Sequence, residues 1–145
     1  MAGEFLTRDE IERVSAAIRA AESNTSCELR VHLEKRCTSD ALTRARELLT
    51  QLGMRATERR NAVLLYIATG DRLFAIAGDE AAHEAVGGDT FWNGTRDRLS
   101  ARFRDGRFCD GICEALSEVG ERLTARFPQA GGGDNELPDE PTFGD

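Results

Sequence analysis

Long hydrophobic runs are missing from this sequence of 145 residues. No apolar stretch approaches the roughly 20 residues that a helix needs to cross a bilayer, so we expect no membrane span. The first residues, Met-Ala-Gly-Glu-Phe-Leu, also lack the basic start and the apolar segment of a secretory signal. The sequence as given therefore predicts a cytoplasmic location.

An excess of positive charge is also missing, because 19 Lys and Arg stand against 26 Asp and Glu. The net charge is −7, and Gln129–Asp145 carries five acidic residues and no basic one. A protein that binds nucleic acid needs a basic face to neutralise phosphates, so we expect no nucleic-acid partner. Neither GxGxxG nor a Walker pattern occurs, and we therefore expect no nucleotide cofactor.

Cysteine is scarce, with Cys27, Cys37, Cys109 and Cys113 alone. In a reducing compartment these thiols do not form disulfides. The interval between Cys27 and Cys37 is not that of a zinc knuckle, so we expect no structural zinc site. We expect Cys27, Cys109 and Cys113 to be small core residues.

Apolar periodicity predicts alternating helices and strands. A helix begins at a capping box of Thr7 and Glu10, and a strand with alternating polar residues follows at 27–34. A second helix leads to a strand at 61–68 and a hairpin partner at 73–77, and two more helices begin near Asp89 and Phe108. These elements predict an α/β fold in which a mixed β-sheet, made of a parallel βαβ unit and an antiparallel hairpin, is sandwiched between helices.

Several details of this fold can be specified. The polar row of the first strand indicates a half-exposed strand, either near a sheet edge or under a polar cover, with His32 at the surface. Gly70-Asp71 favours a two-residue hairpin loop in which Gly supplies a positive φ and Ala68 lies opposite Leu73. Gly94 predicts an irregular start to the helix that Asp89 caps.

One domain at 1–128 and an acidic flexible tail at 129–145 are expected. Within the tail, Asn135-Glu-Leu-Pro138 and Pro141-Thr-Phe143 are two segments that could dock on a surface.

Acidic residues converge in this topology. The end of the third strand lies beside the beginnings of the first two, which gathers Glu28, Asn61, Asp79 and Glu80 at one edge; Asp89 joins them if the intervening turn folds back. Oxygen ligands of this kind suit Ca²⁺ or Mg²⁺. In the alternative interpretation Glu28 pairs with an arginine, Asp79 caps the next helix and Glu80 is solvated.

A second location for a ligand is the opposite edge, beyond the carboxyl ends of the parallel strands, at Arg36–Asp40 and Thr69–Arg72. We rank it behind the acidic edge. No Ser-His-Asp arrangement and no nucleophile elbow is evident, so we assign no catalytic residue. His83 follows the acidic edge closely enough to be a ligand or proton donor, but a packing role is equally compatible with its position.

A series of short segments resembles the TPM domain family, in its compact bacterial branch. The segments occur in the family's order: Thr25–Val31, Leu52–Met54, Arg60–Tyr66, Ala75–Asp79, Phe91-Trp92, Phe108–Ile112 and Asn135–Pro138. Ser26-Cys27-Glu28 and Gly78–His83 depart from the commoner forms of their motifs.

The resemblance implies a mixed sheet between helices, divalent-cation binding in some members and acid phosphatase activity in plant relatives. From the residues and the resemblance together we expect an accessory domain that binds a divalent cation and acts through contacts with a protein partner. The alternative is a metal-dependent acid phosphatase acting on phosphate monoesters.

Overall fold

A computed structural model describes residues 6–25, 27–37, 39–51, 62–79, 82, 89–127 and 141–144. Within these ranges the helices and strands follow one another in the order α1 (Arg8–Glu22), β1 (Glu28–Glu34), α2 (Ala41–Gln51), β2 (Ala62–Ala68), β3 (Leu73–Gly78), α4 (Asp89–Arg104), α5 (Phe108–Arg126) and β4 (Thr142–Phe143). None of the helices in these ranges is both long and apolar enough to cross a membrane.

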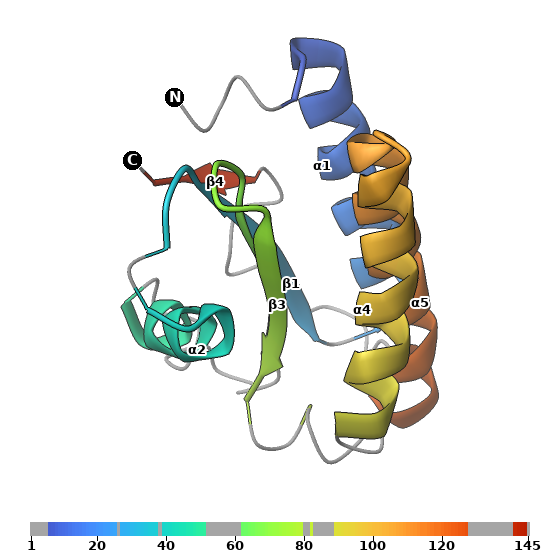
Figure 1. The fold of residues 1–145 in the computed structure, drawn as a ribbon. Coiled ribbons are helices and arrows are strands. Elements are labelled where there is room, and N and C mark those ends of the chain that lie inside the picture. Colours follow the sequence, from blue (N-terminus) through green and yellow to red (C-terminus); the bar gives the residue numbers. More distant parts are fainter. Residues whose placement is uncertain are drawn as a thin grey trace.

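The strands form one mixed sheet in the order β3-β2-β1-β4. β1 runs parallel to β2 and to β4, and β3 returns antiparallel to β2. α2 covers one face of the sheet, whereas α1, α4 and α5 cover the other (Figure 1). The α/β fold expected from the sequence, a mixed sheet between helices, is therefore confirmed.

Two hydrophobic cores follow from the alternation of side chains along the strands. Val31, Val63 and Ile76 point to the α1, α4 and α5 side, and Leu64 and Tyr66 point to α2. Cys27 and Cys109 are buried as expected, Cys113 is only partly buried against the core, and none of the four described cysteines forms a disulfide.

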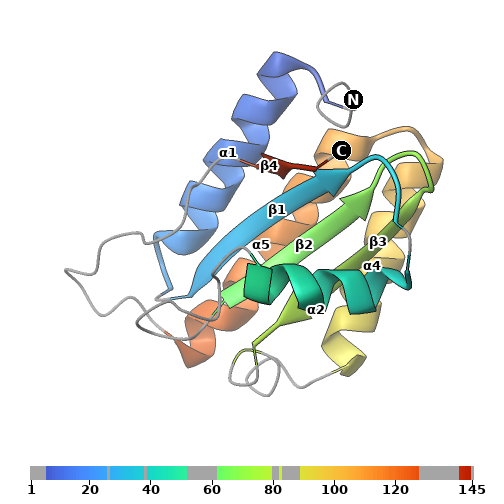
Figure 2. The ribbon, with the colours of Figure 1, turned by 90° about the vertical axis from the view of Figure 1, so that its left-hand side faces the viewer.

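The polar row of β1 is the first correction to the sequence-based expectation. All seven residues of β1 are buried, including the four polar ones, and His32 is only 5% exposed. α2 lies over this face and β4 extends the sheet beyond β1 (Figure 2). The strand is therefore interior, and the prediction that His32 lies at the surface is wrong.

The capping box predicted at the start of α1 is confirmed. Glu10 N–H donates to Thr7 Oγ1 at 3.1 Å, and Thr7 N–H donates to Glu10 Oε1 at 2.9 Å. This reciprocal pair satisfies two backbone donors that a helix start otherwise leaves unbonded. Leu6, immediately before the cap, is buried in the core.

The hairpin has the expected register but a different turn. Ala68 lies opposite Leu73, as expected, so the loop between the paired residues is Thr69–Arg72. Arg72, not Gly70, has the positive φ, at 54°. Gly70 is needed for another reason: a Cβ there would lie 2.6 Å from the Lys35 carbonyl oxygen. The small residue allows the hairpin to approach the segment after β1.

The last helices are regular over their described lengths. α4 begins at Asp89 and continues through Gly94 to Arg104, so the irregular start expected near Gly94 is not observed. α5 buries the apolar row that predicted it, which includes Ile112, Leu116 and Leu123.

The last described residues of the tail pair with the sheet. Thr142 and Phe143 form β4 and lie opposite His32 and Leu33. The docking that the sequence allowed for Pro141-Thr-Phe143 is thus observed, whereas the part of the expected flexible tail before Pro141 lies outside the described residues.

Candidate functional site

The acidic edge begins with a row of three residues across three strands. Glu28 lies opposite Ala62 in the parallel pair, and Asp79 N–H donates to the Ala62 carbonyl oxygen at 3.0 Å. Laterally adjacent residues of a sheet point to the same face. Ala62 packs in the core beneath α2, so Glu28 and Asp79 lie on that face as well. The structure brings these two predicted residues to one edge and one face.

The Asp79 carboxylate is held by backbone donors. Its Oδ2 accepts from Ala62 N–H and its Oδ1 from Ala82 N–H, both at 2.9 Å. The bond to the residue three positions later is the capping arrangement of the alternative interpretation.

The remaining predicted ligands cannot be placed with these two. Asn61, Glu80 and His83 lie outside the described residues, and Asp89 is described only as the first residue of α4. Glu28 is 4% exposed and Asp79 is 7% exposed. Within the described ranges, no group of three or more His, Cys, Asp or Glu residues is arranged to hold a metal ion. The cation site therefore stays a prediction.

A second polar cluster lies under α2, toward the carboxyl end of β1. We call it the Glu34 network; its members are His32, Glu34, Arg44, Tyr66 and Thr142. Tyr66 donates its hydroxyl hydrogen to Glu34 Oε2 at 2.8 Å, and Arg44 donates Nε–H to the same oxygen at 3.1 Å. Arg44 also pairs with Glu34 Oε1.

His32 completes this network. Its Nε2 lies 3.3 Å from Glu34 Oε1, and its Nδ1 lies 2.8 Å from Thr142 Oγ1. Its ring stacks with that of Tyr66 at a centroid distance of 6.3 Å. The imidazole therefore connects β1, β2 and β4 in one buried layer.

Burial and partners act in opposite directions on these groups. Burial alone would raise the pKa of Glu34, but hydrogen bonds from Arg44 and Tyr66 outweigh it and lower the pKa to about 2. Burial lowers the pKa of His32 despite its contact with Glu34, and burial raises the pKa of the Tyr66 hydroxyl. At neutral pH the network holds an ionised carboxylate and a neutral imidazole.

At the second candidate location, the segment after β1 and the hairpin turn are hydrogen-bonded to each other. Thr69 N–H donates to the Glu34 carbonyl at 2.6 Å, and Gly70 N–H donates to the Lys35 carbonyl at 2.7 Å. Asp71 Oδ2 accepts from Cys37 N–H at 2.7 Å. These three hydrogen bonds connect the segment after β1 to the hairpin turn.

Thr142 and Gly144 lie against the other members of the Glu34 network. Gly144 N–H donates to the Leu33 carbonyl at 2.6 Å. A Cβ at Gly144 would lie 2.7 Å from Glu34 Cγ and 3.0 Å from His32 Nε2, so no larger residue fits without movement. The sequence analysis did not identify Glu34, Arg44 or Tyr66 as members of a polar cluster. The signal that could have indicated it is a tyrosine within an apolar strand that pairs with a strand carrying a polar row.

The same order of elements occurs in known proteins. The TPM domain model matches residues 2–122 of the sequence. The chain belongs to the TPM domain family. The likeness inferred from short ordered segments is thereby confirmed over most of the chain.

Solved structures agree with this membership. The TPM chain is 38% identical to the BA42 protein of the psychrophilic bacterium Bizionia argentinensis, with a TM-score of 0.89 over 99% of each chain. An N-terminal domain from P. gingivalis is 17% identical, with a TM-score of 0.67 over 85% of this chain and 79% of its own.

A third solved structure is the N-terminal domain of the cg2496 protein of Corynebacterium glutamicum. It is 13% identical, with a TM-score of 0.63 over 89% of this chain and 78% of its own. At these identities the last two structures support the fold alone. No curated protein matches the TPM chain.

Proposed function

We propose that this TPM domain is an accessory module that binds a divalent cation at its acidic edge and acts through contacts with a partner protein. The proposed ligands are Glu28, Asn61, Asp79, Glu80 and Asp89. The observation that supports the proposal is the row Glu28–Ala62–Asp79, which aims two carboxylates to one face at the open end of the hairpin.

The spacing of the row suits a shared ion. Glu28 and Asp79 are two strands apart, which corresponds to about 10 Å between their Cα atoms. Two carboxylates that extend from such positions can converge on one cation, which holds its oxygens at about 2.3–2.6 Å when it is calcium. Ala62 stands between them, and its side chain is small.

The chemistry of the proposed ligands favours calcium over magnesium. Carboxylate and amide oxygens from strand ends and loops form a flexible set, and calcium accepts six to eight oxygens in variable geometry. Magnesium needs a near-ideal octahedron and releases its water reluctantly. Asp79 is the anchor of the site, because two backbone N–H groups fix its direction.

The proposal is tested by thermal unfolding with and without calcium. With a Kd of about 1 mM, about 10 mM calcium adds about 1.4 kcal/mol to the free energy of unfolding and raises the Tm by about 4 °C. Asp79→Asn and Glu28→Gln should each remove this calcium-dependent rise. The quantity compared is the rise within each variant, because Asp79→Asn also loses a backbone hydrogen bond and lowers the Tm without calcium.

Matched controls carry the same chemical change at exposed positions. Asp97→Asn on α4 and Glu12→Gln on α1 should keep the calcium-dependent rise in Tm, since both side chains are exposed and away from the row. An unchanged Tm at about 10 mM calcium in the unsubstituted protein would refute the cation half of the proposal, because weak calcium modules bind at about 0.1–1 mM.

A further inference from the structure

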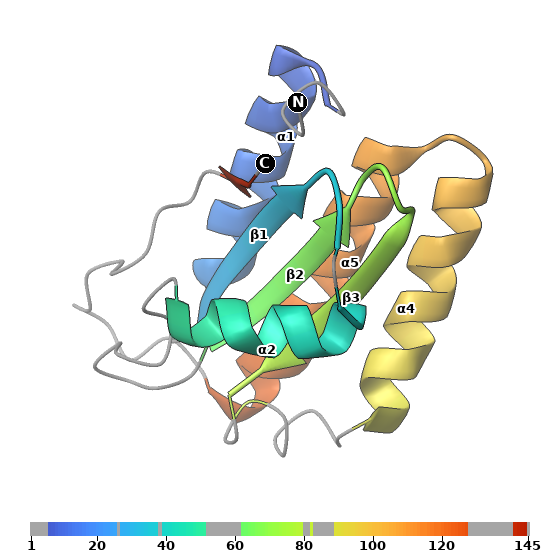
Figure 3. The ribbon, with the colours of Figure 1, turned by 60° about the vertical axis from the view of Figure 1, so that its left-hand side comes forward.

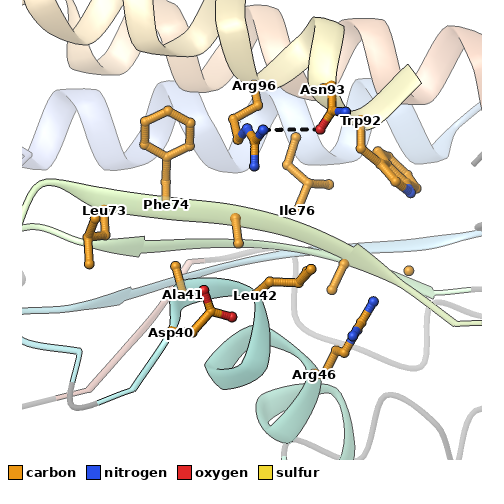
Figure 4. A pocket seen from close by; sticks show the side chains of 13 residues that line it. Asp40, Ala41, Leu42, Arg46, Leu73, Phe74, Ile76, Trp92, Asn93 and Arg96 are labelled. Atoms are coloured by element: carbon orange, nitrogen blue, oxygen red, sulfur yellow. Dashed lines mark hydrogen bonds between the residues drawn. The ribbon is translucent and has the colours of Figure 1, made fainter. Parts of the chain in front are cut away.

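The outer edge of β3 lies in a groove between two helices. β3 is the terminal strand of the sheet, with α2 on one side of it and α4 on the other (Figure 3). The groove has a cavity volume of about 320 Å³, and the strand Leu73–Gly78 forms its floor. Leu42 and Arg46 line the α2 wall, while Trp92 and Arg96 line the α4 wall (Figure 4). We call this the β3 groove.

The backbone of β3 offers hydrogen bonds to this groove. Asp79 N–H points to β2, because it donates to Ala62, and the direction of the backbone alternates along an antiparallel strand. Phe74, Ile76 and Gly78 therefore direct their N–H and C=O groups away from β2 and toward the groove. No strand in the described ranges pairs with this edge. An edge of this kind is a template for an added strand.

The charges of the walls select the partner. Five other arginines of the described chain pair with carboxylates, as in Arg13–Asp110, Arg44–Glu34, Arg98–Glu118, Arg102–Glu114 and Arg107–Asp110. Arg46 and Arg96 form no ion pair within the described residues. Arg96 donates to the Asn93 amide oxygen at 3.1 Å, which leaves its charge uncompensated (Figure 4).

One acidic residue, Asp40, lines this groove, and hydrogen bonds from Thr43 together with the charge of Arg46 lower the pKa of its carboxyl group. Asp40 Oδ2 accepts from Thr43 N–H and from Thr43 Oγ1, both at 3.0 Å, at the start of α2. The lining therefore carries two arginines against one carboxylate, and this excess of positive charge attracts carboxylates from outside. Apolar groups also line the groove, notably Trp92 and Leu73, of which Leu73 is 43% exposed.

We propose that the β3 groove binds an extended acidic segment of a partner protein as a fifth strand of the sheet. The inference rests on the protein-contact half of the proposed function and is independent of cation binding. Main-chain bonds to Phe74, Ile76 and Gly78 supply affinity, and the walls supply specificity. Arg46 and Arg96 lie on opposite faces of the sheet, so the two acidic residues that meet them are separated by an odd number of positions.

Capped peptides with the same composition test this geometry. In Thr-Glu-Val-Leu-Glu-Thr the glutamates lie three positions apart and reach opposite faces. In Thr-Glu-Val-Glu-Leu-Thr they lie two positions apart and reach the same face. With ¹⁵N-labelled full-length protein, the first peptide should shift the amide signals of Phe74, Ile76 and Gly78, and the second should bind at least about fivefold more weakly.

Backbone methylation separates strand addition from simple charge attraction. In an added strand, the backbone N–H groups of alternate residues point toward β3. Methylation of these nitrogens in the first peptide should abolish binding, whereas methylation of the nitrogens that point away from β3 should not.

Charge reversal tests the two walls of the groove. Arg46→Glu and Arg96→Glu should each weaken binding by about fivefold or more. A peptide with lysine in place of both glutamates should recover affinity for the variant that carries both substitutions. Arg8→Glu on α1 makes the same charge change away from the groove and should leave binding unchanged.

Several outcomes would overturn the proposal. They are the absence of shifts at millimolar peptide, equal binding of both methylated peptides, and shifts at His32 and Thr142 that place the peptide at the other edge of the sheet. Self-association of the protein that blocks the peptide would instead assign the edge to a second copy of the chain. The calcium response is measured without peptide, so a failure of cation binding is recognised separately.

Discussion

Tyr66 donates a 2.8 Å hydrogen bond to Glu34 across two adjacent strands, although 32 residues separate them in the sequence. Their side chains lie in the layer beneath α2, where Arg44 supplies the compensating charge. A buried carboxylate is tolerated only when such partners replace its hydration. The strand β1 therefore depends on residues of β2 and α2 to remain inside the sheet.

The stability of the protein should depend on pH through Glu34. The pKa is about 2 in the folded protein against an ordinary 4.5, so the carboxylate stabilises the fold above pH 4.5, and this contribution disappears as the pH falls toward 2. The difference corresponds to about 3 kcal/mol in the free energy of unfolding. Urea unfolding at about pH 6 and about pH 3 should show about 2 kcal/mol of this loss, because the folded carboxylate is still largely ionised at pH 3.

Glu34→Gln tests the assignment, because an amide does not titrate. The free energy of unfolding of this variant should be lower at neutral pH and should fall less steeply below pH 4.5. Glu12→Gln, an exposed change on α1, should keep the slope of the unsubstituted protein. Equal slopes for the Glu34→Gln variant and the unsubstituted protein would show that other groups control acid unfolding.

Two glycines within helices should respond to alanine in opposite directions. At Gly94 of α4 a Cβ meets only Arg98 side-chain atoms, the nearest at 3.5 Å, so Gly94→Ala should stabilise by about 0.5–1 kcal/mol through helix propensity. At Gly120 of α5 a Cβ would lie 2.8 Å from the Ala21 Cβ of α1. Gly120→Ala should therefore destabilise by about 1–3 kcal/mol. Urea midpoints of both variants give the signs, and destabilisation by Gly94→Ala would contradict the geometry of α4.

The docking of β4 should be separable from the fold. Gly144→Ala places a methyl group 2.7 Å from Glu34 Cγ and should displace β4. Because only two residue pairs join β4 to β1, we expect a loss of only about 1 kcal/mol in the free energy of unfolding. Amide signals of Thr142 and Phe143 should move toward unfolded positions, and the His32 amide should exchange faster.

Phe143→Thr is the control for this prediction. The Phe143 side chain is 42% exposed and threonine also favours strands, so the substitution should leave β4 in place. Retention of β4 in the Gly144→Ala variant would mean that Glu34 and His32 can move aside.

Phosphatase chemistry is the alternative that the TPM resemblance implies, and it makes a distinct prediction. A metal-dependent enzyme would hydrolyse a chromogenic phosphate ester by a mechanism that uses the acidic edge, so Asp79→Asn would reduce the rate at least about tenfold. We expect no hydrolysis that depends on Asp79, because we assign the edge to binding alone. Asp97→Asn is the matched control, and a loss of rate specific to Asp79→Asn would favour the enzyme.

Much of the fold could be predicted because its signals are local. The capping box of Thr7 and Glu10 and the register of Ala68 with Leu73 each depend on residues close in sequence. The alternation in the strands and the apolar row of α5 likewise set each element before any long-range contact forms. The meeting of Glu28 and Asp79 at one edge then followed from strand direction.

The burial of the polar row could not be predicted in the same way. His32 is enclosed by Thr142, which lies 110 residues further along the chain, and Glu34 is enclosed by Tyr66 and Arg44. No spacing within β1 distinguishes a solvated polar row from one whose partners arrive on other elements. The turn conformation was also decided by a distant contact, since the approach to Lys35 restricts Gly70.

The amino-acid sequence alone determined which segments form the main helices and the first three strands, the direction of those strands and the family of the chain. Tertiary structure alone decided that β1 is interior, that β4 closes the Glu34 network and that the edge of β3 opens between Arg46 and Arg96. The reason is physical: backbone preferences and apolar periods act over a few residues, whereas burial and charge compensation depend on which side chains meet after the chain has folded.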